Sequence, residues 1–335
     1  MKTQVLSTHS PELFDAAVKR ATELLRASEV VALPTETVYG LAANALDEKA
    51  VAKIFHIKVR PANNPIIVHV ASHEMVKRCV KKFPAAAEKL AKSFWPGPLT
   101  LVLPRAKEIP KIVTAGGETV GVRWPGHPFI QAVIRECDFP LAAPSANLFS
   151  RVSPTNAEHV FKQLGGKIPL IVDGGQSQVG IESTVLDLTV SPPRILRPGM
   201  IHAETLAAVI GHIQHSTFNI QHLALRSPGL LAKHYSPKAK LLVLKWADNT
   251  DLAAALVTRH VSLVTCFIIA HTIIPAAGTF GGVSVLPRDA SAFARALYAE
   301  MHRCDEAGAE WIVVETPPDA PEWSGVADRL RRAGA

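Results

Sequence analysis

Polar side chains that could hold a small zwitterion follow Pro34 at the end of an apolar run. Thr35, Glu36 and Thr37 supply two hydroxyl groups and a carboxylate. The hydroxyl groups can donate to a ligand carboxylate, and the glutamate can accept from a ligand ammonium group. Threonine pairs also cap helices, and the local pattern alone favours a cap over a ligand site.

A second polar group, Lys58 and Arg60, places two positive charges one residue apart. These residues end a predicted helix and enter the loop 61–65, which begins and ends with proline. Lysine acts as a point charge and arginine as a bidentate fork, and this combination suits a triphosphate. The alternative is a solvated basic helix end, which the helix dipole also favours.

Three further polar side chains lie in or directly after apolar runs. His69 interrupts the run 66–70 and is interpreted, taken alone, as a core histidine. Arg123 and Arg197 each end a β-like run and precede a turn that contains proline and glycine. They could project into a cleft, and a structural salt bridge is the equal alternative.

Short hydrogen-bonding side chains lie in several predicted loops, among them Ser145, Asn147, Ser153 and Ser183. Taken alone, each is as readily a turn or cap residue as a ligand contact. The P-loop, dinucleotide-binding and nucleophile-elbow motifs are absent from the sequence, so these three schemes have no support. No run of carboxylates forms an obvious metal cage, although Mg²⁺ often binds through substrate phosphates.

The elements that must position these residues alternate between helix and strand. Ser10 and Pro11 begin a helix with a regular apolar stripe, and Asp47 caps another helix. Short apolar runs predict strands at 30–33, 66–70, 99–103, 120–123, 141–144, 169–173 and 183–188. The segment 34–41 is accordingly predicted to be a strand-to-helix connection. Together these elements predict an α/β domain over residues 1–212, with a sheet that need not be purely parallel.

The rest of the chain divides into a linker and a second domain. Periodicity fades in residues 213–237, where serine–proline turns predict an interdomain linker. Strand-like runs at 241–244, 261–270 and 311–314 then alternate with helical patterns. This predicts a second α/β domain over residues 238–335.

Charge and composition bound the class of protein. Residues 1–225 hold 24 Lys and Arg against 18 Asp and Glu, a net charge of +6 that suits a polyphosphate or RNA ligand. A solvated basic surface is the alternative. The N-terminus lacks a secretory apolar stretch, and the run 261–275 is shorter than the ~20 residues of a membrane helix, so a cytoplasmic protein without membrane contact is predicted. The four cysteines have neither zinc nor disulfide spacing and are interpreted as structural.

An ordered set of nine segments resembles the threonylcarbamoyl-AMP synthase family with its YrdC-like fold. The segments read PTETVYGL, KVRPANNPIIVHV, FWPGPLTLVLP, TVGVRWP, APSAN, SPT, DGG, GIESTVLDL and ILRPG, and they cover roughly residues 20–212. The run His234-Tyr235-Ser236-Pro237 and the following α/β region resemble the long, two-domain form of the family. One departure lies in residues 148–152, Leu-Phe-Ser-Arg-Val, where the family commonly begins with Ser-Gly, and a stiffer loop is expected there.

The resemblance implies a fold and a reaction. The fold would be a YrdC-like catalytic domain with a twisted mixed sheet, joined by the linker to a smaller Rossmann-like α/β domain. The enzyme would be a nucleotidyltransferase that makes L-threonylcarbamoyladenylate from L-threonine, bicarbonate or CO2 and ATP, with Mg²⁺ and release of pyrophosphate. A separate transferase complex would use the product to modify the adenosine beside the tRNA anticodon, and weak direct binding of tRNA or other RNA is a further expectation.

The resemblance also implies residue roles. The threonine pocket would be lined by Thr37, His69, Arg123, Ala143 and Ser183. The residues in contact with ATP would be Arg60, Asn64, Thr119, Ser145, Asn147, Ser153 and Arg197, with His234 and Tyr235 reaching the nucleotide from the linker. Lys58 and Arg60 would neutralise charge that develops during the reaction. Two alternatives stay open at this point: an RNA-binding module without catalysis, and a regulatory protein that senses threonine or a nucleotide.

Overall fold

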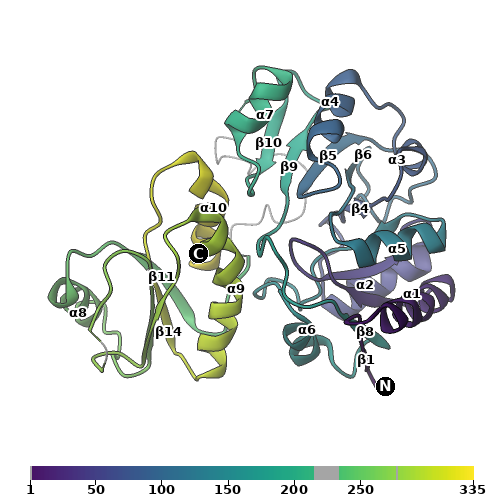
Figure 1. The fold of residues 1–335 in the computed structure, drawn as a ribbon. Coiled ribbons are helices and arrows are strands. Elements are labelled where there is room, and N and C mark those ends of the chain that lie inside the picture. Colours follow the sequence, from purple (N-terminus) through teal and green to yellow (C-terminus); the bar gives the residue numbers. More distant parts are fainter. Residues whose placement is uncertain (1, 215–233, 277) are drawn as a thin grey trace.

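The computed structural model describes residues 2–214, 234–276 and 278–335, which form two separate sheets (Figure 1). The predicted linker 213–237 falls largely on residues 215–233, outside the described residues. We call residues 2–214 the N-terminal unit and the described residues of 238–335 the C-terminal unit; residues 234–237 lead into the latter. The mixed sheet of the first unit and the α/β arrangement of the second confirm the predicted fold class.

The N-terminal unit contains a mixed sheet of ten strands in the order β1-β8-β2-β3-β7-β4-β6-β5-β9-β10. Its elements are β1 (Gln4–Ser7), α1 (Pro11–Arg26), β2 (Val31–Leu33), β3 (Gly40–Asn44), α2 (Glu48–Lys58), β4 (Val68–His69), α3 (His73–Cys79), α4 (Ala85–Phe94), β5 (Leu99–Pro104), β6 (Thr119–Arg123), α5 (Pro128–Cys137), β7 (Leu141–Ala142), α6 (Ala157–Leu164), β8 (Leu170–Asp173), β9 (Thr184–Asp187), β10 (Arg194–Arg197) and α7 (Ala203–Ile210).

The C-terminal unit contains four parallel strands in the order β11-β14-β12-β13. Its elements are β11 (Lys240–Leu244), α8 (Asn249–Val257), β12 (Cys266–Ala270), β13 (Gly282–Val285), α9 (Ala290–Glu306), β14 (Trp311–Glu315), a short 3₁₀ helix (Pro321–Trp323) and α10 (Ser324–Ala333). Figure 1 shows α9 and α10 on the side of this sheet that faces the N-terminal unit, with α8 on the other side.

Helix α1 begins where its cap signals predict. The Ser10 hydroxyl accepts from the Leu13 amide at 3.3 Å, and Pro11 occupies the first turn, where its missing N–H costs nothing. The apolar stripe packs against α5, with the rings of Phe14 and Phe129 meeting edge to face at 5.1 Å. Burial of this stripe supplies most of the stability of such a helix.

The predicted strand-to-helix connection at 34–41 is wrong. Residues 40–44 form β3, which pairs antiparallel with β2, and α2 begins only after its cap at Asp47. Leu41, Ala42 and Ala43 are fully buried in the middle of the sheet. A short apolar run buried on both faces shows no period that separates strand from helix. The polar residues 35–39 therefore join two neighbouring strands.

Most of the buried apolar residues of the N-terminal unit belong to one core that extends along its sheet. The four cysteines, Cys79, Cys137, Cys266 and Cys304, are free and buried. Within the described ranges, no helix has the length and apolar character to cross a membrane.

Candidate functional site

A pocket opens in the N-terminal unit where β4 and β6 end and the loops around 37, 145 and 183 meet. It brings together ten of the residues predicted from the sequence: Thr37, Arg60, His69, Arg123, Ala143, Ser145, Ser183, Arg197, His234 and Tyr235. The segments that supply them are far apart in the chain, so the fold itself creates the site. Whether each residue binds the predicted substrate stays a prediction.

Arg123 and Thr37 form one wall of the pocket. Arg123 Nη1 donates to Thr37 Oγ1 at 2.8 Å, and the Thr37 hydroxyl lies 2.9 Å from the hydroxyl of Thr35. Arg123 Nη2 also lies 2.6 Å from Glu36 Oε1. The Thr35 hydroxyl accepts from the Thr37 and Val38 amides and closes a turn between β2 and β3. The helix cap that the local pattern favoured is therefore wrong, and the hydroxyls of Thr35 and Thr37 both line the pocket.

His69 stands beside Arg123 because β4 and β6 pair in parallel with these two residues in register. Burial and, to a lesser degree, the positive charge of Arg123 lower the pKa of His69 to about 3. The imidazole is therefore neutral at physiological pH. Its Nδ1 atom is buried without a hydrogen-bond partner among the described residues, so it is available to a ligand.

Ser183 and Arg197 also line the pocket, directly before β9 and at the end of β10, respectively. The Ser183 hydroxyl lies 2.8 Å from the Thr100 hydroxyl and accepts from Arg197 Nη2 at 3.1 Å. Arg197 Nε donates to the Ser183 carbonyl at 3.1 Å. Because β9 and β10 pair antiparallel, the end of one strand holds the beginning of the other. The Ser183 hydroxyl is thus held in position beside the pocket.

Arg60 enters the pocket from the loop after α2 and is held by that loop. Its Nε donates to the Asn64 carbonyl at 3.1 Å, and its Nη2 donates to Asn64 Oδ1 at 2.8 Å and to the Pro65 carbonyl at 2.7 Å. Burial lowers the pKa of Arg60 to about 9, which still leaves it charged near neutral pH. Asn64 does not line the pocket but fixes the guanidinium that does.

Lys58 lies behind the pocket and is not part of its lining. Its Nζ donates to the carbonyls of Ser145 and Asn147 and, at 3.3 Å, to Asn147 Oδ1. Burial, followed by the charge of Arg60, lowers the pKa of Lys58 well below its ordinary value. This lysine therefore ties the loop that carries Ser145 to the end of α2.

Three other predicted nucleotide contacts also lie outside the pocket lining. The Asn147 side chain donates to the Leu148 carbonyl at 3.0 Å and to the Arg151 carbonyl at 2.7 Å, which closes the loop between them. Ser153 donates to Glu182 at 2.6 Å. Thr119 begins β6, opposite Pro104.

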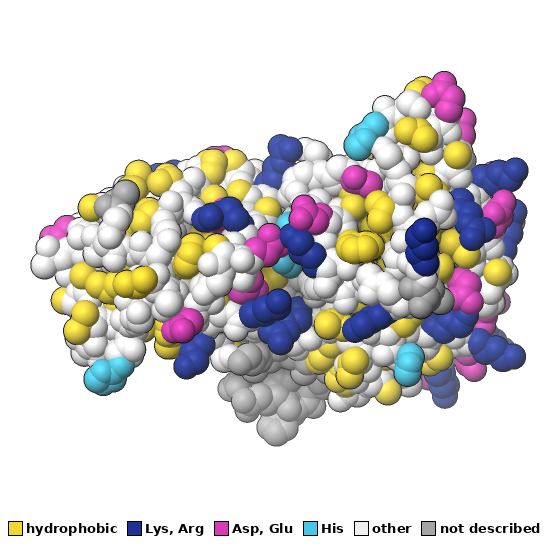
Figure 2. All heavy atoms as spheres, turned by 90° about the horizontal axis from the view of Figure 1, so that it is seen from below, with side chains coloured by type: hydrophobic (Ala, Val, Ile, Leu, Met, Phe, Trp, Pro, Cys, Tyr) yellow, Lys and Arg dark blue, Asp and Glu magenta, His cyan; other side chains and the backbone are white. Residues whose placement is uncertain are grey.

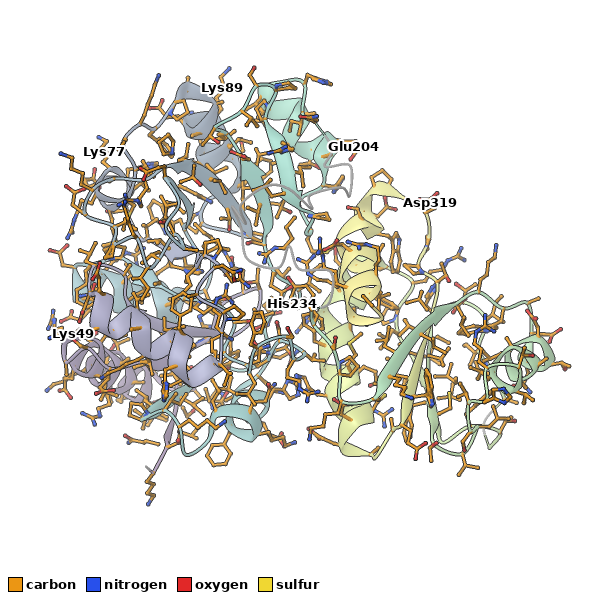
Figure 3. All side chains as sticks on the ribbon, turned by 180° about the vertical axis from the view of Figure 1, so that it is seen from behind. Lys49, Lys77, Lys89, Glu204, His234 and Asp319 are labelled. Atoms are coloured by element: carbon orange, nitrogen blue, oxygen red, sulfur yellow. The ribbon has the colours of Figure 1, made fainter. Side chains whose placement is uncertain are left out.

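His234 and Tyr235 reach the pocket from the segment that leads into the C-terminal unit, and Figure 3 shows His234 at the junction of the two units. The rings of His234 and Tyr235 meet at 4.1 Å, and Phe149 contacts His234 edge to face at 5.7 Å. Tyr235 has a φ of 63°, a left-handed conformation that is uncommon for a residue with a side chain. Burial lowers the pKa of His234 to about 3, so this ring is neutral as well.

Several further residues line the pocket that the sequence interpretation did not assign to it, although it considered Thr35 as a possible ligand contact. They are Thr35, Val38, Tyr39, Gly40, Ile67, Pro144 and Glu182. Most neighbour a predicted residue in the same motif, so the motif itself was the available signal. Glu182 is the acidic side chain among the described lining residues, and three guanidinium groups outnumber it. The pocket is therefore suited to anionic ligands.

Two family models and several known proteins match this chain. A family described as "Telomere recombination" matches residues 23–199, and one described as "Threonylcarbamoyl-AMP synthase, C-terminal domain" matches residues 201–335. The threonylcarbamoyl-AMP synthase of Bacillus subtilis is 40% identical over 99% of this chain and 95% of its own length. That of Pyrococcus abyssi is 46% identical over 68% of each chain. The crystal structure of P. abyssi Sua5 complexed with L-threonine superposes with a TM-score of 0.90 at 36% identity, covering 100% of this chain and 98% of its own.

Proposed function

The chain belongs to the threonylcarbamoyl-AMP synthase family, and we propose that its pocket holds L-threonine and ATP side by side. The protein is a nucleotidyltransferase that makes L-threonylcarbamoyladenylate, the donor for threonylcarbamoyladenosine modification of tRNA. The observation that carries the placement of the substrates is the convergence of Arg60, Arg123 and Arg197 on one pocket. Family membership disfavours the two alternatives, a non-catalytic RNA-binding module and a ligand-sensing regulator.

The threonine half of the proposed site lies at Arg123. Its guanidinium would pair with the substrate carboxylate, with the Thr37 hydroxyl beside it. Ser183 and the neutral His69 would face the amine and the hydroxyl, and Ala143 would contact the methyl group. A pocket that hydrogen-bonds the substrate hydroxyl rejects valine much more strongly than serine. Serine is therefore the expected erroneous substrate.

The ATP half of the proposed site lies at Arg60, Arg197 and Ser145. The two guanidinium groups would hold phosphate oxygens, while His234 and Tyr235 would contact the nucleotide from the linker side. Asn64, Lys58 and Asn147 would act indirectly, since they hold Arg60 and the Ser145 loop. We propose that Ser153 and Thr119 contact ATP when the nucleotide is bound.

The proposed chemistry needs no covalent enzyme intermediate. The free amine of threonine attacks the carbon of CO2 and releases a proton, which gives a carbamate; from bicarbonate, the amine proton and a hydroxide leave together as one water molecule. A carbamate oxygen then attacks the α-phosphorus of ATP in line, and the bond to the β-phosphate oxygen breaks to release pyrophosphate. Arg60 and Arg197 stabilise the developing negative charge, and the pocket contributes by holding the two anions together.

We propose that Mg²⁺ binds mainly through the ATP phosphates. Among the described residues no group of three or more His, Cys, Asp or Glu side chains is placed to hold a metal ion. The Glu182 carboxylate already accepts from Ser153, Arg329 and Tyr298. A cation held by phosphate oxygens fits such a site, and it would neutralise the pyrophosphate leaving group.

The wider assignments are also proposals. We propose a catalytic domain at 1–212, a linker that acts as a lid at 213–237 and a second domain at 238–335; the two separate sheets support this division. We propose that the protein acts in the cytoplasm and passes its product to a tRNA-modifying transferase complex. Figure 2 shows many Lys and Arg side chains over the N-terminal unit and its junction with the C-terminal unit, which supports weak contact with RNA.

Mass spectrometry of the reaction products tests the proposed function. The full-length protein is incubated with L-threonine, bicarbonate and magnesium ATP, and we expect threonylcarbamoyl-AMP together with pyrophosphate. A reaction without threonine is the control and should yield neither compound. Pyrophosphate release at the control rate, with no adenylate product, would contradict the proposal.

A further inference from the structure

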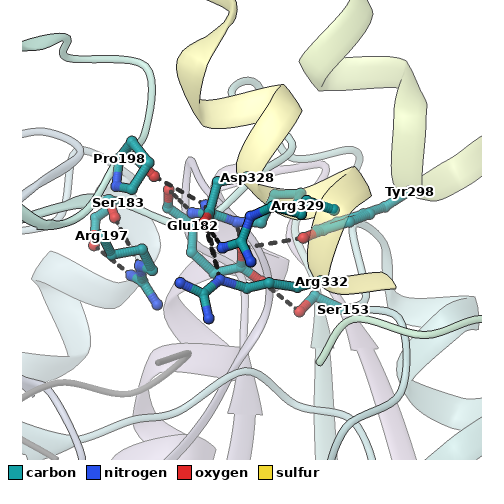
Figure 4. A network of polar contacts seen from close by, with 10 residues as sticks. Ser153, Glu182, Ser183, Arg197, Pro198, Tyr298, Asp328, Arg329 and Arg332 are labelled. Atoms are coloured by element: carbon teal, nitrogen blue, oxygen red, sulfur yellow. Dashed lines mark hydrogen bonds and ion pairs between the residues drawn. The ribbon is translucent and has the colours of Figure 1, made fainter. Parts of the chain in front are cut away.

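Arg329 extends from α10 of the C-terminal unit to the pocket segment of the N-terminal unit (Figure 4). Its Nε donates to Glu182 Oε2 at 2.7 Å and its Nη2 to the Glu182 carbonyl at 3.0 Å. Its Nη1 donates to the Pro198 carbonyl at 2.9 Å. The residue is 0% exposed. One guanidinium thus holds both the segment before Ser183 and the segment after Arg197.

Glu182 links Arg329 to the pocket. Its Oε1 accepts from the Ser153 hydroxyl at 2.6 Å, and its Oε2 accepts from the Tyr298 hydroxyl at 3.1 Å. Burial by itself would raise the pKa of Glu182, but the charges of Arg329 and Arg197 and the Ser153 hydrogen bond outweigh it and lower the pKa to about 2. The carboxylate is therefore charged, and Arg329 is its closest cation.

Two glycines bring the backbones of the units into direct contact at the same place. A Cβ atom on Gly325 of α10 would lie 2.9 Å from the carbonyl carbon of Gly199. A Cβ atom on Gly180 would lie 2.4 Å from the Ala294 carbonyl oxygen of α9, and this glycine has a φ of 84°. Contacts this close leave the loops little freedom to shift. The C-terminal unit therefore determines where residues 180–183 and 197–199 lie.

We propose that Arg329 is a positioning residue for the reaction, through which the C-terminal unit orders Glu182 and Ser153 for nucleotide binding. This gives the C-terminal unit a role in catalysis beyond the substrate contacts proposed above. The inference rests on the proposed function for its kinetic readout, but ATP binding tests it separately. Arg329 itself does not line the pocket.

The proposal predicts specific consequences of losing the guanidinium. In R329M, Glu182 is left as a buried carboxylate without its closest cation, so its pKa should rise and Ser153 should lose a fixed partner. The titratable groups that face Glu182 from α9, α10, β10 and the linker side are Tyr298, Arg329, Arg197, His234 and Tyr235, of which the two arginines are charged. The acid limb of the pH–activity profile should therefore move to higher pH in R329M.

The experiment compares R329M, R329K, R329M/E182Q and the control R303M in the full-length protein. Arg303 lies in α9 and pairs with Glu300 at 2.6 Å within its own helix, so R303M removes an arginine that is not among the groups acting on Glu182. ATP affinity is measured by equilibrium dialysis with ATP alone, and KM for ATP, KM for threonine and kcat are measured across pH 5 to 8. Circular dichroism reports folding of each variant.

We expect R329M to weaken ATP binding about tenfold, as loss of a charged hydrogen bond does, with a smaller change in KM for threonine. R329K should restore the position of the acid limb but not the ATP affinity. Lysine keeps the positive charge but cannot form the bidentate hydrogen bonds of a guanidinium. The double variant R329M/E182Q should lack the shifted acid limb of the pH–activity profile.

Folded R329M with wild-type ATP affinity, KM values and pH profile would overturn the inference. If R329M does not fold, the double variant R329M/E182Q is measured in its place. Wild-type ATP affinity in that double variant would also overturn the inference. Failure of the wild-type protein to make product would instead refute the proposed function, while the dialysis measurement would still report on Arg329.

Discussion

Arg123, which lines the pocket, forms an ion pair with Glu36, with 2.6 Å between Arg123 Nη2 and Glu36 Oε1. Both side chains are largely removed from solvent, at 5% and 13% exposure. The same guanidinium donates to Thr37 and to the Gly97 carbonyl. Its orientation is thus fixed before any ligand arrives, and a substrate carboxylate that binds it loses less conformational freedom on binding.

Replacement of Arg123 by methionine should weaken the binding of threonine more than the binding of ATP. We expect KM for threonine to rise about 30-fold, because a charge-assisted hydrogen bond contributes roughly 2 kcal/mol. KM for ATP should change little, since Arg60 and Arg197 remain in place. Initial rates at varied concentrations of each substrate give both constants.

The same substitution leaves Glu36 buried without its cation, which also destabilises the fold. The double variant R123M/E36Q is the control, because it removes the unpaired carboxylate. We expect the double variant to recover folding free energy in urea but not the KM for threonine. Recovery of both would mean that Arg123 acts on the fold alone and does not contact the substrate.

The parts of the fold that local chemistry determines could be predicted from the sequence. Ser10 and Asp47 cap helices as expected, because a cap needs only residues within one turn. The segment 34–41 could not be assigned correctly, since β3 lies between the neighbouring β2 and the distant β7, and no local pattern shows that second partner. The same reasoning applies to Glu182: its cation, Arg329, is 147 positions away, and no local pattern links them.

The direction in which Lys58 points was equally beyond the sequence. A lysine at a helix end usually extends into solvent, whereas this side chain is 1% exposed and holds two loop carbonyls. The burial follows from the loop 145–147 folding over the end of α2. Only the tertiary structure brings these segments together, although both belong to motifs that the family resemblance identified.

Replacement of Lys58 by methionine should destabilise the protein as well as reduce its activity. The substitution leaves buried carbonyl groups unpaired, and we expect a loss of about 2–4 kcal/mol in the free energy of unfolding. Urea denaturation measures this loss. Lys49, exposed at the start of the same helix and placed on the outer side in Figure 3, offers the control K49M, which should unfold like the wild type. Lower ATP affinity in K58M with unchanged unfolding would instead show direct contact with phosphate.

The stacked pair His159 and His302, with ring centroids 3.9 Å apart, predicts a loss of stability in acid. Burial lowers the pKa of His159 to about 3, and burial lowers the pKa of His302 as well. Each imidazole binds protons more readily in the unfolded chain, whose histidines titrate near ~6.5. Stability is therefore complete above that pH and is lost as the pH falls from about 6.5 toward 3.

Urea unfolding at pH 7.5 and at pH 5 tests the histidine pair. H302F keeps an aromatic ring against His159 but removes one titrating group and the repulsion between two protonated rings. We expect it to lose less stability between the two pH values than the wild type does. H9Q changes an exposed histidine near the N-terminus and should behave like the wild type. An equal loss of stability in H302F and in the wild type would show that the histidine pair does not cause the pH dependence.

Tyr235 is the most direct test of the proposed linker contact with the nucleotide. Its ring lies 5.2 Å from the Arg329 guanidinium and 6.1 Å from the ring of Tyr298, and it also lines the pocket. We expect Y235A to raise KM for ATP about tenfold, since loss of a buried aromatic contact costs roughly 1.5 kcal/mol. Y235F keeps the ring and should stay near the wild-type value. Steady-state kinetics with varied ATP separates the two variants.

The comparison of these two variants distinguishes packing from nucleotide binding. If Tyr235 only fills the space between the units, Y235A should unfold more easily while the folded fraction binds ATP as the wild type does. If the ring contacts the nucleotide, saturating ATP should stabilise the wild type and Y235F against urea more than it stabilises Y235A, because a ligand stabilises a fold in proportion to its affinity. Equal stabilisation of all three proteins by ATP would exclude the contact and leave Tyr235 as an interface residue.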